Sequence, residues 1–187
     1  MSILELRQYT LRAGQRDILI DLFERQLIEP QEAAGAVVVG QFRDLERPDR
    51  FVWLRAFPTM AARKAALEAF YGGPVWKAYR SAANATMIDS DNVLLLRSVG
   101  SEWPLQLPPR PPNESTIAAR SIVVASIYTR SAAVDDRFLQ QFEQVSASTQ
   151  PLATFQTEYA ENDYPALPVR TGEHVFVTLS RFEDGED

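Results

Sequence analysis

The chain has 187 residues, of which 45% are apolar and 24% charged, with one histidine and no cysteine. This composition is that of an ordinary globular protein of one or two small domains. The lack of cysteine excludes disulfides, thiol nucleophiles and iron–sulfur clusters, and a single histidine excludes a histidine-rich metal site within one chain. The net charge of −6 and the pI near 4.9 argue against broad binding to nucleic acid or anionic membranes.

The chain shows no targeting or membrane signal. No segment approaches the roughly 18–20 consecutive apolar residues that a membrane-spanning helix needs. Residues 1–9 alternate in polarity and lack the basic start and apolar block of a signal peptide. We therefore expect a cytoplasmic protein whose partner is a small-molecule ligand, with neither nucleic acid nor membrane bound. Whether the chain forms a homo-oligomer stays open.

The first half of the chain predicts the element order β-α-β-β-α-β. The expected elements are strands over 4–10, 36–43, 50–57 and 92–97 and helices over 15–33, 60–70 and 74–85. Pro30 should kink or shorten the first helix near its end, because proline lacks the N–H that a helix interior uses. Thr59 should cap the second helix, and Pro74 should open the third.

A proline-rich segment separates this half from a second set of elements. Residues 103–112 contain five prolines, which favours an extended linker. The expected elements beyond it are strands over 120–128, 152–160 and 174–182 and a helix over 134–148. We therefore predict a first domain over 1–98, a linker over 99–116 and a second domain over 117–187.

The sequence of the second domain predicts a diverged repeat of the first. Tyr9-Thr10 recurs 119 positions later as Tyr128-Thr129, and the pattern that starts at Phe51 recurs 125 positions later from Phe176. The difference of six falls in one loop, where residues 164–168 form an insertion. The second copy stops after its third strand, so it is a partial repeat that would leave an open sheet edge.

Four segments of the first half resemble the NIPSNAP family: residues 51–55, 61–63, 74–80 and 92–96. The resemblance covers residues 4–97 well and the second half only as a partial copy. It implies an α+β fold of the dimeric α/β-barrel group, in which two ferredoxin-like sheets face each other and close a barrel. That group contains heme-binding proteins, cofactor-independent monooxygenases and isomerases. NIPSNAP proteins carry no settled catalytic signature to transfer.

Strand alternation then separates a helix-facing side from a cavity-facing side. We expect Leu4, Leu6 and Leu54 to face the helices. Charged and aromatic residues of the same strands should face the barrel cavity, close to one another because the first and third strands are neighbours. With their counterparts in the second half, the candidate ligand-binding residues are Glu5, Arg7, Tyr9, Trp53, Arg55, Tyr128 and Thr178.

Each of these residues has a plainer interpretation as well. Glu5 with Arg7 or Arg55 would also fit a cross-strand ion pair, and Trp53 would also fit simple packing. Tyr9 and His174 are the weak catalytic candidates, the histidine as a general base, an axial heme ligand or only a residue at a strand end.

Two charged runs complete the set of candidates. The run Arg63-Lys64 is expected on a helix exterior. The acidic stretch Glu158, Glu161 and Asp163 fits either acid–base work or a solvated hairpin.

Three functions fit these sequence features. The first is a small-molecule-binding barrel, extended to a cofactor-independent enzyme of the oxygenase or isomerase type. The second is a non-catalytic binding or assembly module, because no nucleophile, metal or cofactor motif is present. The third is a heme-binding barrel. We predict no cofactor under the first two.

Overall fold

The computed structural model describes residues 2–100, 103–107, 109–111, 121–147 and 151–183. These residues form two compact units, unit 1 from 2–96 and 159–171 and unit 2 from the described parts of 97–158 and 172–183. Much of the predicted linker and the start of the predicted second domain, residues 112–120, lie outside the described residues. The predicted boundaries therefore stay a prediction. None of the helices in the described ranges is both long and apolar enough to cross a membrane.

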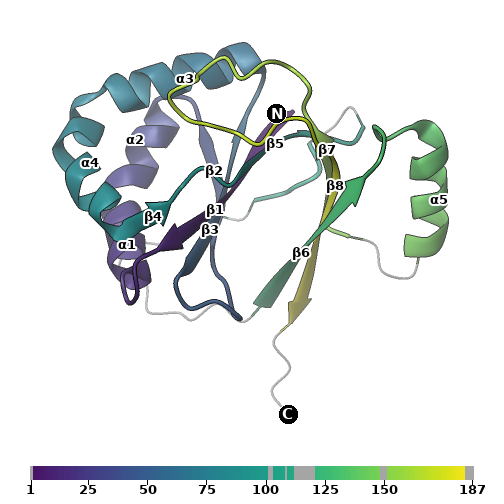
Figure 1. Cartoon of the computed structure of the whole chain (residues 1–187), viewed down its shortest axis with the longest axis horizontal. Helices are drawn as coiled ribbons and strands as arrows, with labels where there is room; N and C mark the ends of the chain where they lie inside the picture. Colours follow the sequence, from purple (N-terminus) through teal and green to yellow (C-terminus); the bar gives the residue numbers. More distant parts are fainter. Residues whose placement is uncertain (1, 101–102, 108, 112–120, 148–150, 184–187) are drawn as a thin grey trace. The chain divides into compact units, whose positions relative to one another are not determined.

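Unit 1 is an antiparallel sheet with helices on one face (Figure 1). Its elements are β1 (Ile3–Leu11), α1 (Arg16–Leu22), η1 (Phe23–Leu27), α2 (Ile28–Ala33), β2 (Val37–Arg43), β3 (Arg50–Phe57), α3 (Met60–Gly72), α4 (Pro74–Thr86), β4 (Met87–Asp89) and β5 (Val93–Ser98). The strand order is β2-β3-β1-β5, with β4 beside β1. This is the ferredoxin-like arrangement, so the predicted α+β class and element order are confirmed.

The first helix differs from its prediction around Pro30. The helix does not end at this residue but continues to Ala33. The irregularity lies upstream in η1, a π-helical segment in which the Ile28 N–H donates to the Phe23 carbonyl, five residues earlier. A π segment adds a residue to one turn, and such segments occur often at functional sites. The irregular turn therefore precedes Pro30, and the helix ends at Ala33, where the predicted range also ends.

The predicted assignment of sheet faces is wrong. Tyr9 and Trp53 pack with Phe23 and Phe70 of the helices, so the odd-numbered residues of β1 and β3 face the helices. Glu5, Arg7 and Arg55 share that face because strand alternation places them with Tyr9 and Trp53. The even-numbered leucines, Leu4, Leu6 and Leu54, lie on the opposite face. The alternation of the two faces along each strand is confirmed. The side that faces the helices was assigned from polarity, which fails here because charges that pair with one another can occupy a helix-covered face.

The helix α3 starts as the sequence predicts and ends two residues later than predicted, at Gly72. The Thr59 hydroxyl accepts a hydrogen bond from the Ala62 N–H at 3.1 Å, which caps the helix. Gly73 separates α3 from α4, and a Cβ added there would lie 2.9 Å from the Ala69 carbonyl oxygen. The close approach of residue 73 to the carbonyls at the end of α3 therefore favours glycine.

One segment from late in the chain belongs to unit 1. Residues 159–171 pack beside α3 and β5 and appear as the yellow-green loop next to α3 in Figure 1. The Arg170 N–H donates to the Val93 carbonyl at 2.8 Å, and Tyr164, Leu167 and Val169 pack on the core at Phe57 and Leu67. This loop contains the insertion noted in the sequence.

Unit 2 is smaller and has one helix. Its elements are β6 (Ser121–Arg130), α5 (Asp136–Ser146), β7 (Ala153–Thr157) and β8 (His174–Glu183). Its strands are antiparallel in the order β7-β8-β6. Phe138 and Phe142 of α5 pack edge-on against Phe176 of β8, and Asp135 caps the helix. All four predicted elements of the second half are present in the described residues, with ends that differ by up to three residues.

Equivalent strands pair in the same way in the two units. Tyr9 of β1 lies opposite Phe51 of β3, and Tyr128 of β6 lies opposite Phe176 of β8. These are the two residue pairs that the sequence comparison equates, and in both units the third strand lies between the second and the first. The correspondence favours an internal repeat, which stays a prediction, as does a barrel closed by two facing sheets.

Candidate functional site

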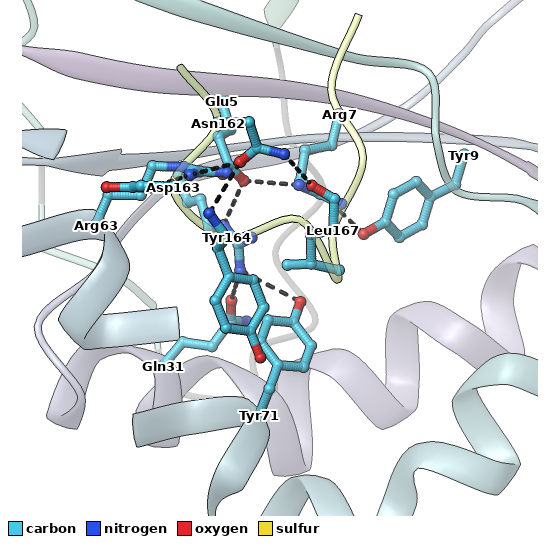
Figure 2. Close-up of polar contacts among 11 residues, drawn as sticks. Glu5, Arg7, Tyr9, Gln31, Arg63, Tyr71, Asn162, Asp163, Tyr164 and Leu167 are labelled. Atoms are coloured by element: carbon cyan, nitrogen blue, oxygen red, sulfur yellow. Dashed lines mark hydrogen bonds and ion pairs between the residues drawn. The ribbon is translucent and has the colours of Figure 1, made fainter. Parts of the chain in front are cut away.

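A cluster of charges around Glu5 lies between the sheet and the helices of unit 1 (Figure 2). One carboxylate oxygen, Oε2, accepts from Arg7 Nη1 and from Arg55 Nε, both at 2.7 Å, and the other, Oε1, accepts from Arg63 Nε at 2.6 Å. All four side chains are buried. Glu5 and Arg7 come from β1, Arg55 from β3 and Arg63 from α3, so the cluster ties both central strands to a helix.

A second layer of polar groups surrounds the arginines. Arg7 Nε donates to the Tyr9 hydroxyl at 2.9 Å, and Arg55 Nη1 donates to Gln31 Oε1 at 2.9 Å and to the Tyr71 hydroxyl at 3.4 Å. Gln31 in turn donates to the Leu27 carbonyl at the end of η1. The guanidinium of Arg55 also lies 5.1 Å from the centre of the Trp53 ring, a cation–π distance.

Loop 159–171 adds the last two members of the cluster. Arg63 Nη1 donates to Asp163 Oδ1 at 2.8 Å and to Asn162 Oδ1 at 3.1 Å. The Tyr164 ring stacks on Tyr71, with ring centres 6.0 Å apart and planes inclined by 26°. Figure 2 shows the loop lying across the cluster with these two rings face to face.

The charges hold one another in the ionised state. Burial alone would raise the pKa of Glu5, but the fields of Arg55, Arg7 and Arg63 outweigh it and hold that pKa well below its ordinary value. Burial likewise opposes the charge of Arg55, but Glu5 outweighs it, so the pKa of Arg55 is raised. Burial raises the pKa of Tyr9, so its phenol stays neutral.

Three buried donors in or beside the cluster are left without an acceptor. Among the described residues, Arg55 Nη2, Arg63 Nη2 and the indole Nε1 of Trp53 have no hydrogen-bond partner. An unsatisfied buried donor costs about 1–3 kcal/mol, and more when it is charged. The cluster also carries an excess positive charge, because three guanidiniums face the carboxylates of Glu5 and Asp163. Both features favour binding of a group that accepts hydrogen bonds.

A cavity of about 30 Å³ lies beside the cluster in unit 1. Its walls include Tyr9, Trp53, Gln31 and Tyr71, and the π-helical segment contributes Phe23 and Leu27. The remaining lining residues are apolar or aromatic side chains of α1, α3, α4 and β4: Leu19, Phe70, Trp76, Ala83 and Met87. Aromatic walls with a few convergent polar groups are typical of small-molecule sites. At this size the cavity has room for one or two water molecules.

The structure brings together five of the seven predicted ligand-binding residues. Glu5, Arg7 and Arg55 form the cluster, and Tyr9 and Trp53 line the cavity. Their predicted proximity is confirmed by the strand register, which places Glu5 opposite Arg55 and Arg7 opposite Trp53. The ion pairs considered as the plainer interpretation of Glu5 are also present. That these residues bind a ligand stays a prediction.

The other candidates lie in unit 2. Tyr128 is exposed on β6, and Thr178 pairs with Ser126 and Thr154 in the sheet. His174 begins β8 opposite Arg130. None of these three residues lines the cavity of unit 1, so their functional roles stay predictions.

Sequence reasoning missed Arg63, and its predicted place on a helix exterior is wrong. Arg63 is fully buried, and the signal was its spacing, because Arg63, Leu67 and Phe70 recur at helical intervals on the buried face of α3. Gln31 and Tyr71 were missed because nothing local marks them. Asp163, the member of the acidic stretch that contacts the cluster, could not be told apart from Glu158 and Glu161 without the loop's fold.

The fold and this site define a ferredoxin-like α+β protein with a buried arginine cluster and an aromatic cavity between sheet and helices. The chain belongs to the NIPSNAP family, whose family model matches residues 4–101, slightly more than half of the sequence. None of the curated proteins matches the chain.

Solved structures are similar in part. A NIPSNAP family protein of unknown function from Agrobacterium tumefaciens has 20% identity and a TM-score of 0.48, over 51% of this chain and 86% of that one. A NIPSNAP-like domain protein from Burkholderia xenovorans has 21% identity and a TM-score of 0.48, over 61% and 97%. A protein from Nitrosomonas europaea described as a putative antibiotic biosynthesis monooxygenase has 14% identity and a TM-score of 0.42, over 54% and 99%.

Proposed function

We propose that unit 1 binds a small organic molecule in the cavity between its sheet and its helices. The observation that carries this proposal is the indole N–H of Trp53, which is buried in a cavity wall and has no acceptor among the described residues. A ligand with an oxygen or nitrogen acceptor would satisfy it. The phenol of Tyr9, the amide of Gln31 and the hydroxyl of Tyr71 offer further polar contacts on the same walls.

The cavity is too small to hold a small organic molecule as it stands. About 30 Å³ is far below the roughly 300–1,000 Å³ of pockets that hold drug-sized ligands. Binding therefore needs an opening movement. Tyr71 and Trp76 are the half-buried walls of the cavity, and Tyr164 covers Tyr71. Displacement of these aromatic side chains would enlarge the site.

A reaction at this site would use Tyr9. Its hydroxyl oxygen accepts from Arg7, and its own proton remains available for a ligand in the cavity. A neutral phenol held in this way can polarise a carbonyl group, which is the kind of step that cofactor-independent isomerases and oxygenases use. We expect Tyr9→Phe to remove such an activity and to leave ligand binding largely intact.

The first test is the identification of a co-purified compound. We expect native mass spectrometry of the wild-type chain to show a bound small molecule that denaturation releases. Trp53→Phe removes the indole N–H and should lose the compound. The matched control is Trp103→Phe, which changes the same residue type in unit 2, where Trp103 packs on Phe155. Equal retention by both variants, or a ligand-free wild-type protein that no added compound stabilises, would contradict the proposal.

A heme-binding role fits this cavity poorly. The cavity is far too small for a porphyrin, and none of its lining residues is a histidine. His174, the axial candidate, lies in the other unit. We therefore propose no heme-dependent step.

An assembly role is the second candidate, and strand β6 favours it. β6 ends the strand order of the described residues, and it exposes Val124 and Tyr128. A long edge strand that carries apolar residues and no charge before Arg130 is a typical surface for pairing with another strand. We propose a second copy of this chain as the partner.

A further inference from the structure

Two of the arginines around Glu5 have hydrogen-bond donors that are left without an acceptor. Glu5 engages Nε of both Arg55 and Arg63 through its two carboxylate oxygens, which places the two guanidiniums beside each other. The Nη2 groups of both arginines are buried and have no acceptor in the described ranges of the chain. A guanidinium presents its donors as a planar fork that matches the two oxygens of a carboxylate. The unused donors thus suit a second carboxylate.

A carboxylate from the chain itself already contacts one of these two arginines, at Arg63 Nη1 next to the unpartnered Nη2. Asp163 contacts Arg63 Nη1 at 2.8 Å and is 26% exposed, whereas Arg63 is fully buried. It arrives on loop 159–171 and not on an element of the sheet or of the helices. Hydrogen bonds within the loop fix its conformation next to Asp163. Asn162 donates to the Leu167 carbonyl and accepts from the Tyr164 N–H.

The same loop also packs on a residue that lines the cavity. Tyr164, the residue after Asp163, stacks on Tyr71, which lines the cavity and accepts from Arg55. A single displacement of residues 162–164 would therefore free Arg63 and uncover the Tyr71 wall together (Figure 2). One movement would therefore open both the charge site and the Tyr71 side of the cavity.

We propose that Arg63 and Arg55 form an anion subsite for the carboxylate of a small organic acid, and that Asp163 holds Arg63 as a competing internal carboxylate when no ligand is bound. The organic part of the ligand would extend toward Tyr71 and the cavity, so this assignment of ligand class rests on the proposed function. A competing internal carboxylate lowers the apparent affinity for an external one, because only the displaced fraction of molecules is competent to bind.

The test uses the full-length chain and acetate as the probe. Asp163→Asn removes the internal carboxylate and keeps the size of the side chain. We expect this variant to bind acetate at least about tenfold more tightly than the wild type, since the competitor is gone. Its thermal midpoint should be lower than that of the wild type without acetate and should rise as acetate is added at constant ionic strength. The matched control, Glu161→Gln, removes an exposed carboxylate of the same loop and should behave as the wild type.

A second variant leaves every charge in place. Tyr164→Ala removes the stack on Tyr71 and should also tighten acetate binding relative to the wild type, because the loop is displaced more easily. A structural ion pair between Arg63 and Asp163 would give no such gain. This variant keeps the test decisive even if Asp163→Asn folds poorly.

The outcomes separate the two proposals. No tighter acetate binding in either variant, or an equal response to neutral acetamide, would overturn the anion subsite. A response to inorganic phosphate with none to acetate would overturn its assignment to carboxylates. Acetate binding to Asp163→Asn with no organic compound held by the wild type would leave the subsite standing and remove the cavity function. A cavity ligand without acetate binding would do the reverse.

Discussion

Glu5 is the only buried carboxylate in the described part of the chain, and three buried arginines depend on it. Replacement by glutamine keeps the shape but leaves Arg7 and Arg55 without a counter-ion and Arg63 with Asp163 alone. Breaking a buried ion pair from one side costs about 3–5 kcal/mol. We therefore expect Glu5→Gln to lower the free energy of unfolding by about that amount, measured by urea denaturation. Glu46→Gln, at an exposed carboxylate in the β2–β3 turn, should change it little.

The same cluster predicts a pH dependence. The pKa of Glu5 in the folded chain lies below its ordinary value of 4.5. Between these two pKa values the unfolded chain binds the extra proton, so stability falls as the pH falls. The contribution of Glu5 is complete above pH 4.5 and is lost progressively below it.

Urea denaturation between about pH 6 and about pH 3 would measure this effect. The wild type should lose more stability over that range than Glu5→Gln, in which residue 5 no longer titrates. Parallel pH profiles for the two proteins would contradict a depressed pKa of Glu5.

Residue patterns predicted which side chains meet but not where. Strand order and alternation placed Glu5, Arg7, Trp53 and Arg55 together, and the register agrees. The face was wrong because it was inferred from polarity. Charges are expected at a cavity or at a solvent face only when they are unpaired, and here one glutamate and three arginines make their hydrogen bonds to one another and to neighbouring polar side chains. Single-residue polarity does not carry that information.

At the scale of elements, the start of α3 positions Arg63. The Thr59 hydroxyl caps this helix at an exposed position, and loss of such a cap costs about 1 kcal/mol. We expect Thr59→Ala to lower the free energy of unfolding by about 1 kcal/mol, measured by chemical denaturation. Thr59→Ser keeps the accepting oxygen and should retain most of the stability. Equal losses in the two variants would mean that the methyl group, and not the cap, stabilises α3.

Elements were more predictable than the connections between them. Hydrophobic periodicity and capping residues located each described helix and strand except the three-residue β4. The π-helical turn at Phe23–Leu27 leaves no periodic signal, because it shifts the register by only one residue. The destination of loop 159–171 could not be read from its sequence either. Its insertion was visible, but its contact with Arg63 depends on tertiary placement 100 positions along the chain.

At the scale of the whole chain, the two units share a strand order but differ in how fully helices cover them. Unit 1 has helical segments α1, η1, α2, α3 and α4, whereas the described part of unit 2 has α5 alone. Apolar residues of unit 2 are correspondingly exposed, among them Val124, Tyr128 and Phe182 of β6 and β8. The proposed ligand site therefore lies in the helix-covered unit 1, and the proposed assembly surface lies in unit 2.

That division predicts a variant that changes association alone. Val124 lies in the edge strand β6 with 42% of its surface exposed, and a lysine there should block pairing with a second β6, because a symmetric contact brings in the new charge twice. We expect Val124→Lys to weaken self-association at least about tenfold in sedimentation velocity, a change of about 1.4 kcal/mol. Val145→Lys makes the same substitution at a 77% exposed valine of α5 and should sediment as the wild type. A wild-type chain that stays at its monomer mass of 21.1 kDa at every concentration would end the assembly proposal and leave the cavity of unit 1 as the functional site.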